Sequence, residues 1–221
     1  DFREKSIFVC FHYKCRKMKY NLITIVGPTA TGKTAFAARL ATMLGSEIIS
    51  ADSRQVYRNM TIGTGKDLAD YVVDGKQVPY HLVDIVDAGY QYNVYEFQRD
   101  FVTAFQTISA KGKLPILCGG TGLYVEAALK GYKMVEVPAN DVLRAMLENK
   151  SLDELTEILK TYKPLHNTSD IETKRRAIRA IEIADYYRKN ETIETDYPKI
   201  ESLVVGIDIT REERRKRISE R

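Results

Sequence analysis

Apolar residues in this 221-residue chain gather in short runs, and stretches with helical spacing separate the runs. The runs do not alternate with polar residues and are rich in β-branched side chains, a pattern typical of strands buried on both faces. They predict strands at residues 21–26, 47–51, 81–86, 114–118 and 203–209. The intervening periodicity predicts helices at residues 33–44, 94–110, 123–129, 171–189 and from 211 onward.

This alternation of strands and helices predicts an α/β fold. We expect a P-loop NTPase-like arrangement of three layers around a mainly parallel sheet. Residues 132–170 are more polar than the rest, and a capping box at residues 151–154 begins a helix that runs to about Tyr162. We therefore expect a short helical insertion in this part of the chain.

The domain organisation follows from the more polar composition of residues 132–170. We place the core at residues 18–131 and 171–221, with the helix at 171–189 returning the chain from the insertion. The apolar part of the leader, residues 1–17, is too short for a signal peptide, and we expect the leader to lie outside the fold. The last helix is still in progress at Arg221, so we expect the natural chain to continue.

Charge and composition narrow the function only slightly. The net charge is +4, and residues 1–20 supply all of it with six basic and two acidic side chains, so the overall charge does not indicate a nucleic-acid partner. No apolar run is long enough to span a bilayer. The three cysteines show neither zinc spacing nor a CxxC pair, which favours a reducing, cytoplasmic setting.

A phosphate-binding loop lies between the first predicted strand and its helix. Residues 27–34 read GPTATGKT, which matches G-x-x-x-x-G-K-[ST]. Two glycines let the backbone N–H groups turn inward, and the helix N-terminus adds partial positive charge. Lys33 supplies a full charge to the outer phosphates, and the Thr34 hydroxyl suits a Mg²⁺ ligand. The predicted ligands of a di- or triphosphate are Gly27, Pro28, Thr29, Ala30, Thr31, Gly32, Lys33 and Thr34.

Two predicted strands end in residues that suit a site beside this loop. The carboxyl ends of parallel strands face the ligand crevice, so Asp52, directly after the strand at 47–51, points toward the phosphates. Such a carboxylate can hold Mg²⁺ through water, accept a proton from a nucleophile, or simply cap a helix. The strand at 114–118 is followed by two glycines and Thr121, where a motor ATPase would carry an aspartate. This exchange suits close backbone approach and a hydroxyl that faces a substrate, although a plain strand-to-helix turn is the other interpretation.

Two predicted helices carry arginines at helical spacing. Arg175, Arg176 and Arg179 share one face, which suits phosphate or RNA backbone, although a solvated charged face is the other interpretation. In the final helix, Arg214, Arg217 and Arg221 recur at steps of three and four residues. An arginine beside a diphosphate can stabilise a departing group. A basic surface helix is the alternative here.

Four motifs in order resemble the tRNA dimethylallyltransferase (isopentenyltransferase) family. They are GPTATGKT (27–34), SADSRQVYRNMTIGTGK (50–66), GGTGLY (119–124) and RRAIRAIEI (175–183), and the resemblance covers about residues 20–221. It implies transfer of a dimethylallyl group from its diphosphate to N6 of the adenosine 3′-adjacent to the anticodon in tRNA. It also implies the fold of the nucleotide kinases, Mg²⁺ and the anticodon arm of tRNA as partner. We expect a cytoplasmic monomer without a membrane or DNA partner.

The resemblance also implies roles for individual residues. Asp52 is the base that accepts the N6 proton, and Thr29 and Arg221 stabilise the leaving diphosphate oxygen. Lys33 and Thr34 hold the diphosphate and its Mg²⁺. The residues expected to meet the adenosine or to face the tRNA are Asp52, Ser53, Arg54, Gln55, Thr121, Arg144, Arg175, Arg176 and Arg179.

The chain departs from the family at one motif and leaves other functions open. Gly65-Lys66-Asp67 stands where the family usually has Ala-Lys-Pro, and the insertion is short. An adenylate isopentenyltransferase would run the same chemistry on free AMP, ADP or ATP. A P-loop small-molecule kinase also fits Asp52, but the paired arginines of a kinase lid have no clear counterpart. A non-catalytic nucleotide-binding module is the third alternative.

Overall fold

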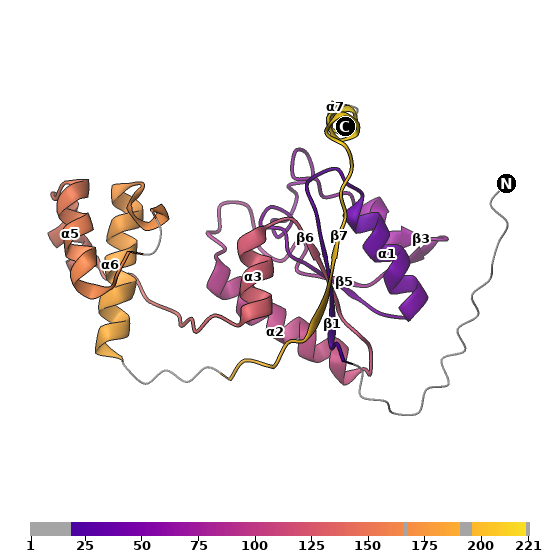
Figure 1. Ribbon diagram of the computed structural model, residues 1–221, viewed down its shortest axis with the longest axis horizontal. Helices are drawn as coiled ribbons and strands as arrows, with labels where there is room; N and C mark the ends of the chain where they lie inside the picture. The colour runs from indigo at the N-terminus through magenta and orange to yellow at the C-terminus, as the bar shows by residue number, and fades with distance from the viewer. Residues whose placement is uncertain (1–18, 166–167, 191–195, 220–221) are drawn as a thin grey trace. The chain divides into compact units, whose positions relative to one another are not determined.

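The computed structural model describes residues 19–165, 168–190 and 196–219. The described part forms two compact units, each with its own hydrophobic core (Figure 1). The first unit contains the described residues up to Gly131 and from Pro198 onward, and the second contains those between. The predicted leader precedes residue 19 and lies outside the described residues.

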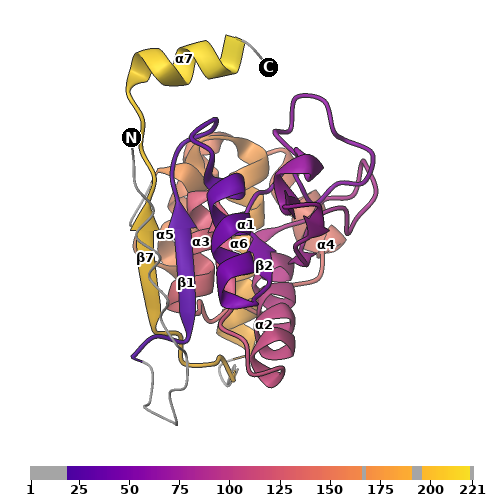
Figure 2. The same cartoon turned by 90° about the vertical axis from the view of Figure 1, so that its right-hand side faces the viewer.

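The first unit is built on a five-stranded parallel sheet with the order β5-β2-β6-β1-β7. Its strands are β1 (Leu22–Val26), β2 (Ile48–Ser50), β5 (Tyr80–His81), β6 (Ile116–Gly119) and β7 (Ser202–Gly206). The register pairs Cys118 with both Ile25 and Ser50, so β1, β6 and β2 end together at one edge. Figure 2 shows the arrowheads of β1 and β7 at this edge. The predicted parallel α/β fold is confirmed.

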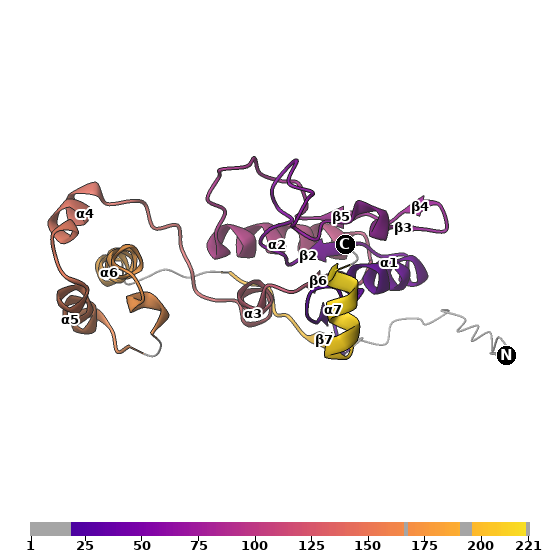
Figure 3. The same cartoon turned by 90° about the horizontal axis from the view of Figure 1, so that it is seen from above.

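Helices cover both faces of the sheet (Figure 3). The first, α1 (Lys33–Leu44), lies on one side, and α2 (Val94–Ala110) and α3 (Gly122–Lys130) lie on the other. Local signals set the ends of α1 and α2, which coincide with the predicted bounds: Gly45 ends α1 with φ 62°, and Asn93 begins α2 in a capping box. The unit also contains η1 (Leu68–Tyr71), β3 (Val72–Val73), β4 (Lys76–Gln77) and α7 (Arg211–Ser219).

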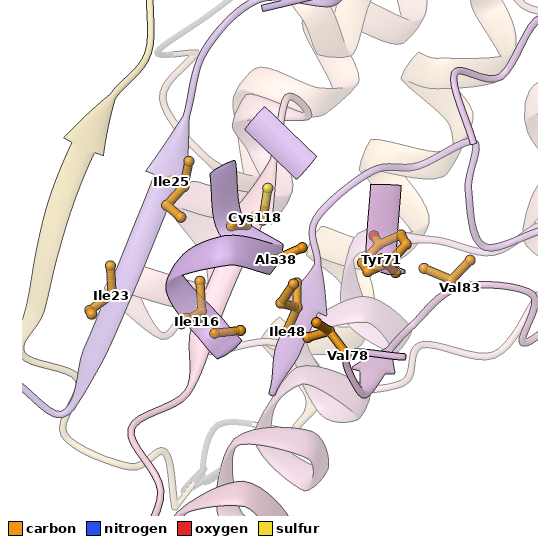
Figure 4. Packing of buried hydrophobic residues seen from close by; sticks show 11 residues of the cluster. Ile23, Ile25, Ala38, Ile48, Tyr71, Val78, Val83, Ile116 and Cys118 are labelled. Atoms are coloured by element: carbon orange, nitrogen blue, oxygen red, sulfur yellow. The ribbon is translucent and has the colours of Figure 1, made fainter. Parts of the chain in front are cut away.

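Small side chains seat α1 on the sheet (Figure 4). Ala37, Ala38 and Ala41 are fully buried, and they lie in one cluster with apolar residues of β1, β2 and β6. Because alanine allows close approach, the loop before α1 is held beside the end of β6. A Cβ added to Gly120 would lie 3.6 Å from the Gly27 carbonyl oxygen and 3.8 Å from Lys33 Nζ. Helix packing therefore places the loop where the strands end.

The second unit is a small helical cluster of α4 (Asp141–Glu148), α5 (Leu152–Tyr162), η2 (Ser169–Ile171) and α6 (Lys174–Lys189). Its core contains Leu155 and Leu159 of α5 and Ala177 and Ile181 of α6. The prediction that the insertion ends at residue 170 and that the helix at 171–189 joins the core is wrong. An amphipathic pattern shows that a helix buries one face, but it does not identify the surface that covers this face.

A buried carboxylate stabilises the amino-terminal end of the sheet. Glu47, directly before β2, is only 3% exposed, and its carboxylate accepts hydrogen bonds from Lys111 Nζ at 2.9 Å and Lys113 Nζ at 2.8 Å. His81 Nε2 lies 2.9 Å from the same group. Burial alone raises the pKa of Glu47, but the contacts with Lys113, His81 and Lys111 outweigh it and lower the pKa from 4.5 to about 2.

We expect Glu47→Gln to lower the free energy of unfolding by about 3 kcal/mol at pH 7. A depressed carboxyl pKa stabilises the fold above the unfolded value, and this contribution disappears as pH falls from about 5 toward 2. Urea unfolding of both proteins at pH 7 and pH 3 should therefore give curves that converge in acid. Glu126→Gln removes the exposed partner of Lys130 and should change stability by less than about 0.5 kcal/mol. A constant difference across pH would contradict the prediction.

Candidate active site

The loop between β1 and α1 has the geometry of a phosphate cradle. Gly32 caps α1 with φ 84°, a left-handed conformation that suits glycine. A Cβ on Gly27 would lie 2.2 Å from the Ile207 carbonyl oxygen, so no larger residue fits there. The Thr31 hydroxyl and Lys33 Nζ both donate to the Pro28 carbonyl oxygen, at 2.9 Å and 2.5 Å. These two bonds connect the start of the loop to its end and stabilise its conformation.

A cavity of about 360 Å³ opens beside this loop. Its walls come from the loop, from the segment after β2, from the turn at residues 63–65, from η1 and from the end of β6. The structure thereby brings together all the predicted diphosphate ligands except Thr31, whose side chain is buried beneath the loop. The predicted adenosine-facing residues that line it are Asp52, Ser53, Arg54, Gln55 and Thr121.

Asp52 is held at the cavity wall by its own segment. Its Oδ1 accepts a hydrogen bond from the Arg54 backbone N–H at 2.9 Å. The Ser53 N–H donates to the Thr121 hydroxyl at 3.0 Å, which joins the segment after β2 to the segment after β6. The Gln55 amide accepts from the Ser50 hydroxyl and donates to the Gly65 carbonyl oxygen. A carboxylate, a hydroxyl and an amide therefore face the phosphate loop from fixed positions.

The cavity has lining residues that the sequence did not reveal. Asp70 and Tyr71 of η1 and the turn at 63–65 form one wall, although no local pattern marks them as site residues. Cys118, a buried residue of β6, also lines the cavity. Burial raises the pKa of its thiol to about 12 against the opposing influence of Lys33, so the thiol is protonated at neutral pH. Burial likewise raises the pKa of Tyr71 well above its usual range. Neither group is a nucleophile in this state.

The Gly65-Lys66-Asp67 departure has a structural explanation. The Lys66 side chain is fully buried, and its ammonium donates to the Tyr57 carbonyl oxygen at 2.6 Å and to the Asp84 carboxylate. Asp67 caps η1 by accepting from the Ala69 N–H at 3.2 Å. The aspartate thus begins the 3-10 helix that brings Asp70 to the cavity.

The predicted tRNA-facing arginines lie in the second unit and are not among the residues that line the cavity. Arg144 forms two hydrogen bonds of 3.0 Å to the buried Glu182 carboxylate, and Arg179 bonds the same group and the Val137 carbonyl oxygen. Burial alone raises the pKa of Glu182, but these arginines and a backbone N–H lower it. Arg176 pairs with Glu172, and the Arg175 side chain is exposed. Arg144 and Arg179 therefore stabilise this unit.

The final helix contributes a cation near the loop. Arg217 Nη1 lies 3.9 Å from the position that a Cβ on Gly32 would occupy, and Arg217 Nε donates to Glu213 at 2.9 Å. Arg221, the predicted partner of Thr29, lies outside the described residues.

Oxygen donors around the cavity fit Mg²⁺. Within the described chain, no group of three or more His, Cys, Asp or Glu side chains could hold a metal ion without help. The Thr34 hydroxyl and the Asp70 carboxylate line the cavity, and such hard oxygens would complete a Mg²⁺ site together with phosphate oxygens. Over the described ranges, the helices are all too short or too polar to cross a membrane.

Comparisons with known proteins agree on one family. The family model described as IPP transferase matches residues 55–221, and the one described as isopentenyl transferase matches residues 20–89. A tRNA dimethylallyltransferase 2 of Bacteroides fragilis is 60% identical over 202 residues, which are 91% of this chain and 66% of the relative. That of Phocaeicola vulgatus is 61% identical over 92% of this chain and 66% of its own length. The chain thus spans 66% of these curated relatives.

Solved structures support the same assignment of fold. The tRNA isopentenylpyrophosphate transferase of Bacillus halodurans aligns over 90% of this chain and 63% of its own, with a TM-score of 0.58 and 34% identity. A eukaryotic dimethylallyltransferase described as acting on tRNA aligns over 84% of this chain and 48% of its own, with a TM-score of 0.64 and 22% identity. The second likeness is evidence for the fold alone.

Proposed function

The chain belongs to the IPP transferase family, and we propose that it transfers a dimethylallyl group from dimethylallyl diphosphate to N6 of the adenosine 3′-adjacent to the anticodon in tRNA. One observation carries the proposal: the Asp52 carboxylate and the phosphate loop line the same cavity. A base and a diphosphate cradle are the two groups that this reaction needs. The names of the relatives, tRNA dimethylallyltransferases at about 60% identity, favour tRNA as the acceptor.

The phosphate loop would bind the donor and stabilise the leaving group. The loop amides and the N-terminus of α1 face the diphosphate, and Lys33 adds a full positive charge. Thr34 would hold Mg²⁺ together with diphosphate oxygens, and the ion would neutralise charge on the leaving group. Thr29 at the cavity wall, with Arg221, would stabilise the oxygen that departs.

Asp52 would activate the acceptor. The carbon–oxygen bond of the allylic diphosphate breaks, and diphosphate leaves with the electron pair. The N6–carbon bond forms, and the N6 proton passes to the Asp52 carboxylate. The bond from the Arg54 N–H holds this carboxylate in place without neutralising it. Ser53, Arg54, Gln55 and Thr121 would position the adenosine, and Arg144, Arg175, Arg176 and Arg179 would face the tRNA from the second unit.

Lys33→Met should weaken dimethylallyl diphosphate binding by about tenfold or more, because a charge-assisted contact to phosphate is lost. Isothermal titration in the presence of Mg²⁺ measures this change. Lys160→Met is the matched control, since Lys160 is exposed in the second unit and pairs with Glu157. Equal affinity of the Lys33 variant and the wild type would exclude the loop as the donor site.

One transfer assay separates the proposed function from its alternatives. The intact protein is incubated with labelled dimethylallyl diphosphate and Mg²⁺, with unmodified tRNA in one tube and AMP or ATP in another. Label in tRNA supports the proposal. Label only in the free nucleotide identifies an adenylate isopentenyltransferase. Phosphate transfer from ATP to a small acceptor, without prenyl transfer, identifies a kinase. Sedimentation with and without tRNA tests the expected monomer.

A further inference from the structure

The turn at residues 60–66 carries an exposed isoleucine at its tip. Ile62 is 96% exposed, the highest value among the large apolar side chains of the described residues, and its neighbour Met60 is 42% exposed. A single exposed apolar residue is ordinary on a protein surface. The stabilisation of this turn is unusual, because buried polar side chains hold it in its conformation.

Three buried side chains hold the turn in shape. The Thr64 hydroxyl donates to the Met60 carbonyl oxygen at 2.7 Å, and Gln55 donates to the Gly65 carbonyl oxygen at 3.3 Å. Lys66 anchors the base of the turn to Tyr57 and Asp84. Burying polar groups of this kind costs free energy that only these bonds offset. The Ile62 side chain is almost fully exposed, so the turn keeps its conformation without packing from this residue.

The position of the turn connects it to the chemistry. Gly63, Thr64 and Gly65 line the cavity with Asp52 and the phosphate loop, so Ile62 directly precedes the cavity wall. Within residues 53–66, Lys66 is buried against Asp84 and Arg58 pairs with Asp87. Arg54, which is exposed and lines the cavity, is the cation of this segment placed to meet a phosphate backbone.

We propose that Ile62 is a wedge that enters the base stack of the anticodon loop when the acceptor adenosine moves into the cavity, an inference that rests on the proposed function. A base inside a stack cannot bring its N6 to Asp52, so it must be extruded, which costs stacking energy. Proteins that unstack nucleic acids insert apolar side chains, isoleucine among them, into the gap. A preformed turn beside the cavity supplies such a side chain without further ordering.

The test compares two acceptors for Ile62→Ala in the intact protein. One is an anticodon stem–loop RNA, and the other is a short unstructured RNA whose adenosine needs no extrusion. We expect kcat/KM for the stem–loop to fall about tenfold, as for loss of one stacking contact, with little change for the short RNA. With 2-aminopurine at the acceptor position of the stem–loop, binding of the Ile62→Ala protein should raise the fluorescence less than binding of the wild-type protein. Ile62→Leu keeps a large apolar side chain, so its kcat/KM and its fluorescence rise should match those of the wild type. Met43→Ala, 83% exposed on α1, is the control.

Each other outcome overturns the wedge. An equal loss for both RNAs indicates a role in the chemistry, and no loss for either shows that Ile62 is dispensable. A fall in Tm of the Ile62→Ala protein shows that Ile62 packs within the protein. If the wild-type protein transfers the prenyl group to neither RNA, the proposed function fails and the wedge fails with it. The wild-type reactions alone reveal this result, without any variant.

Discussion

Replacing Asp52 with asparagine should reduce prenyl transfer by about two to four orders of magnitude, the usual contribution of a general base. Asparagine keeps the oxygen that accepts the Arg54 N–H, so the segment after β2 should hold its shape. The amide cannot take the N6 proton at neutral pH. Donor binding should change by less than about twofold, because charge at the phosphates comes from Lys33 and the loop amides.

Single-turnover transfer to tRNA and titration with dimethylallyl diphosphate together measure these effects. Asp70→Asn is the matched comparison, since it removes the other carboxylate that lines the cavity. We expect a smaller loss of transfer for that variant. Normal turnover of the Asp52 variant would contradict its role as the base. A greater loss of transfer in the Asp70 variant would indicate that Asp70 of η1 is the base.

Gly119→Ala should both destabilise the protein and inactivate it. A Cβ at this position would lie 2.2 Å from the Ala51 carbonyl oxygen and 2.4 Å from its carbonyl carbon. These are backbone atoms of the segment that leads to Asp52, so they cannot move as a flexible side chain would. The Ala51 N–H bond to the Cys118 carbonyl oxygen, 2.8 Å, holds the two strands this close. We expect a loss of about 1–3 kcal/mol in the free energy of unfolding.

Activity should fall further than stability. Separating β2 from β6 would displace Asp52 and break the bond between the Ser53 N–H and Thr121, and a shift of about 1 Å can cost about a hundredfold in rate. Gly122→Ala is the control, because no heavy atom lies within 4 Å of its added Cβ. Urea unfolding and kcat/KM of both variants test the argument. A fully active, fully stable Gly119 variant would exclude the close approach seen here.

Helices with clear end signals were predictable from the sequence. The bounds of α1 and α2 agree with the periodicity because Gly45 and the Asn93 capping box act within one turn of the chain. The predicted strand at 81–86 reduces to β5, Tyr80–His81, since the chain beyond it forms backbone bonds to the segment at 55–58. The position of α6 in the second unit was not predictable, because the surface that covers an apolar face lies elsewhere in the sequence.

The phosphate loop and Asp52 were located from the sequence because their placement follows from local rules. A loop between a parallel strand and its helix, and a residue directly after another strand of the same parallel sheet, both lie at the carboxyl edge of that sheet. Asp70, Tyr71 and the turn at 63–65 were missed, because η1 and the turn reach the cavity only after long-range packing. The roles assigned to these residues in catalysis stay predictions.

The α/β class, the phosphate loop and the family were predictable from the sequence, because each depends on spacing along the chain or on backbone geometry within a few residues. The pairing of the polar groups became visible only in the folded protein. Arg144 and Arg179 bond Glu182, Lys66 is buried against Asp84, and Ile62 is left exposed beside the cavity. Burial and hydrogen bonding depend on neighbours that folding brings together from distant positions, so no local pattern predicts them.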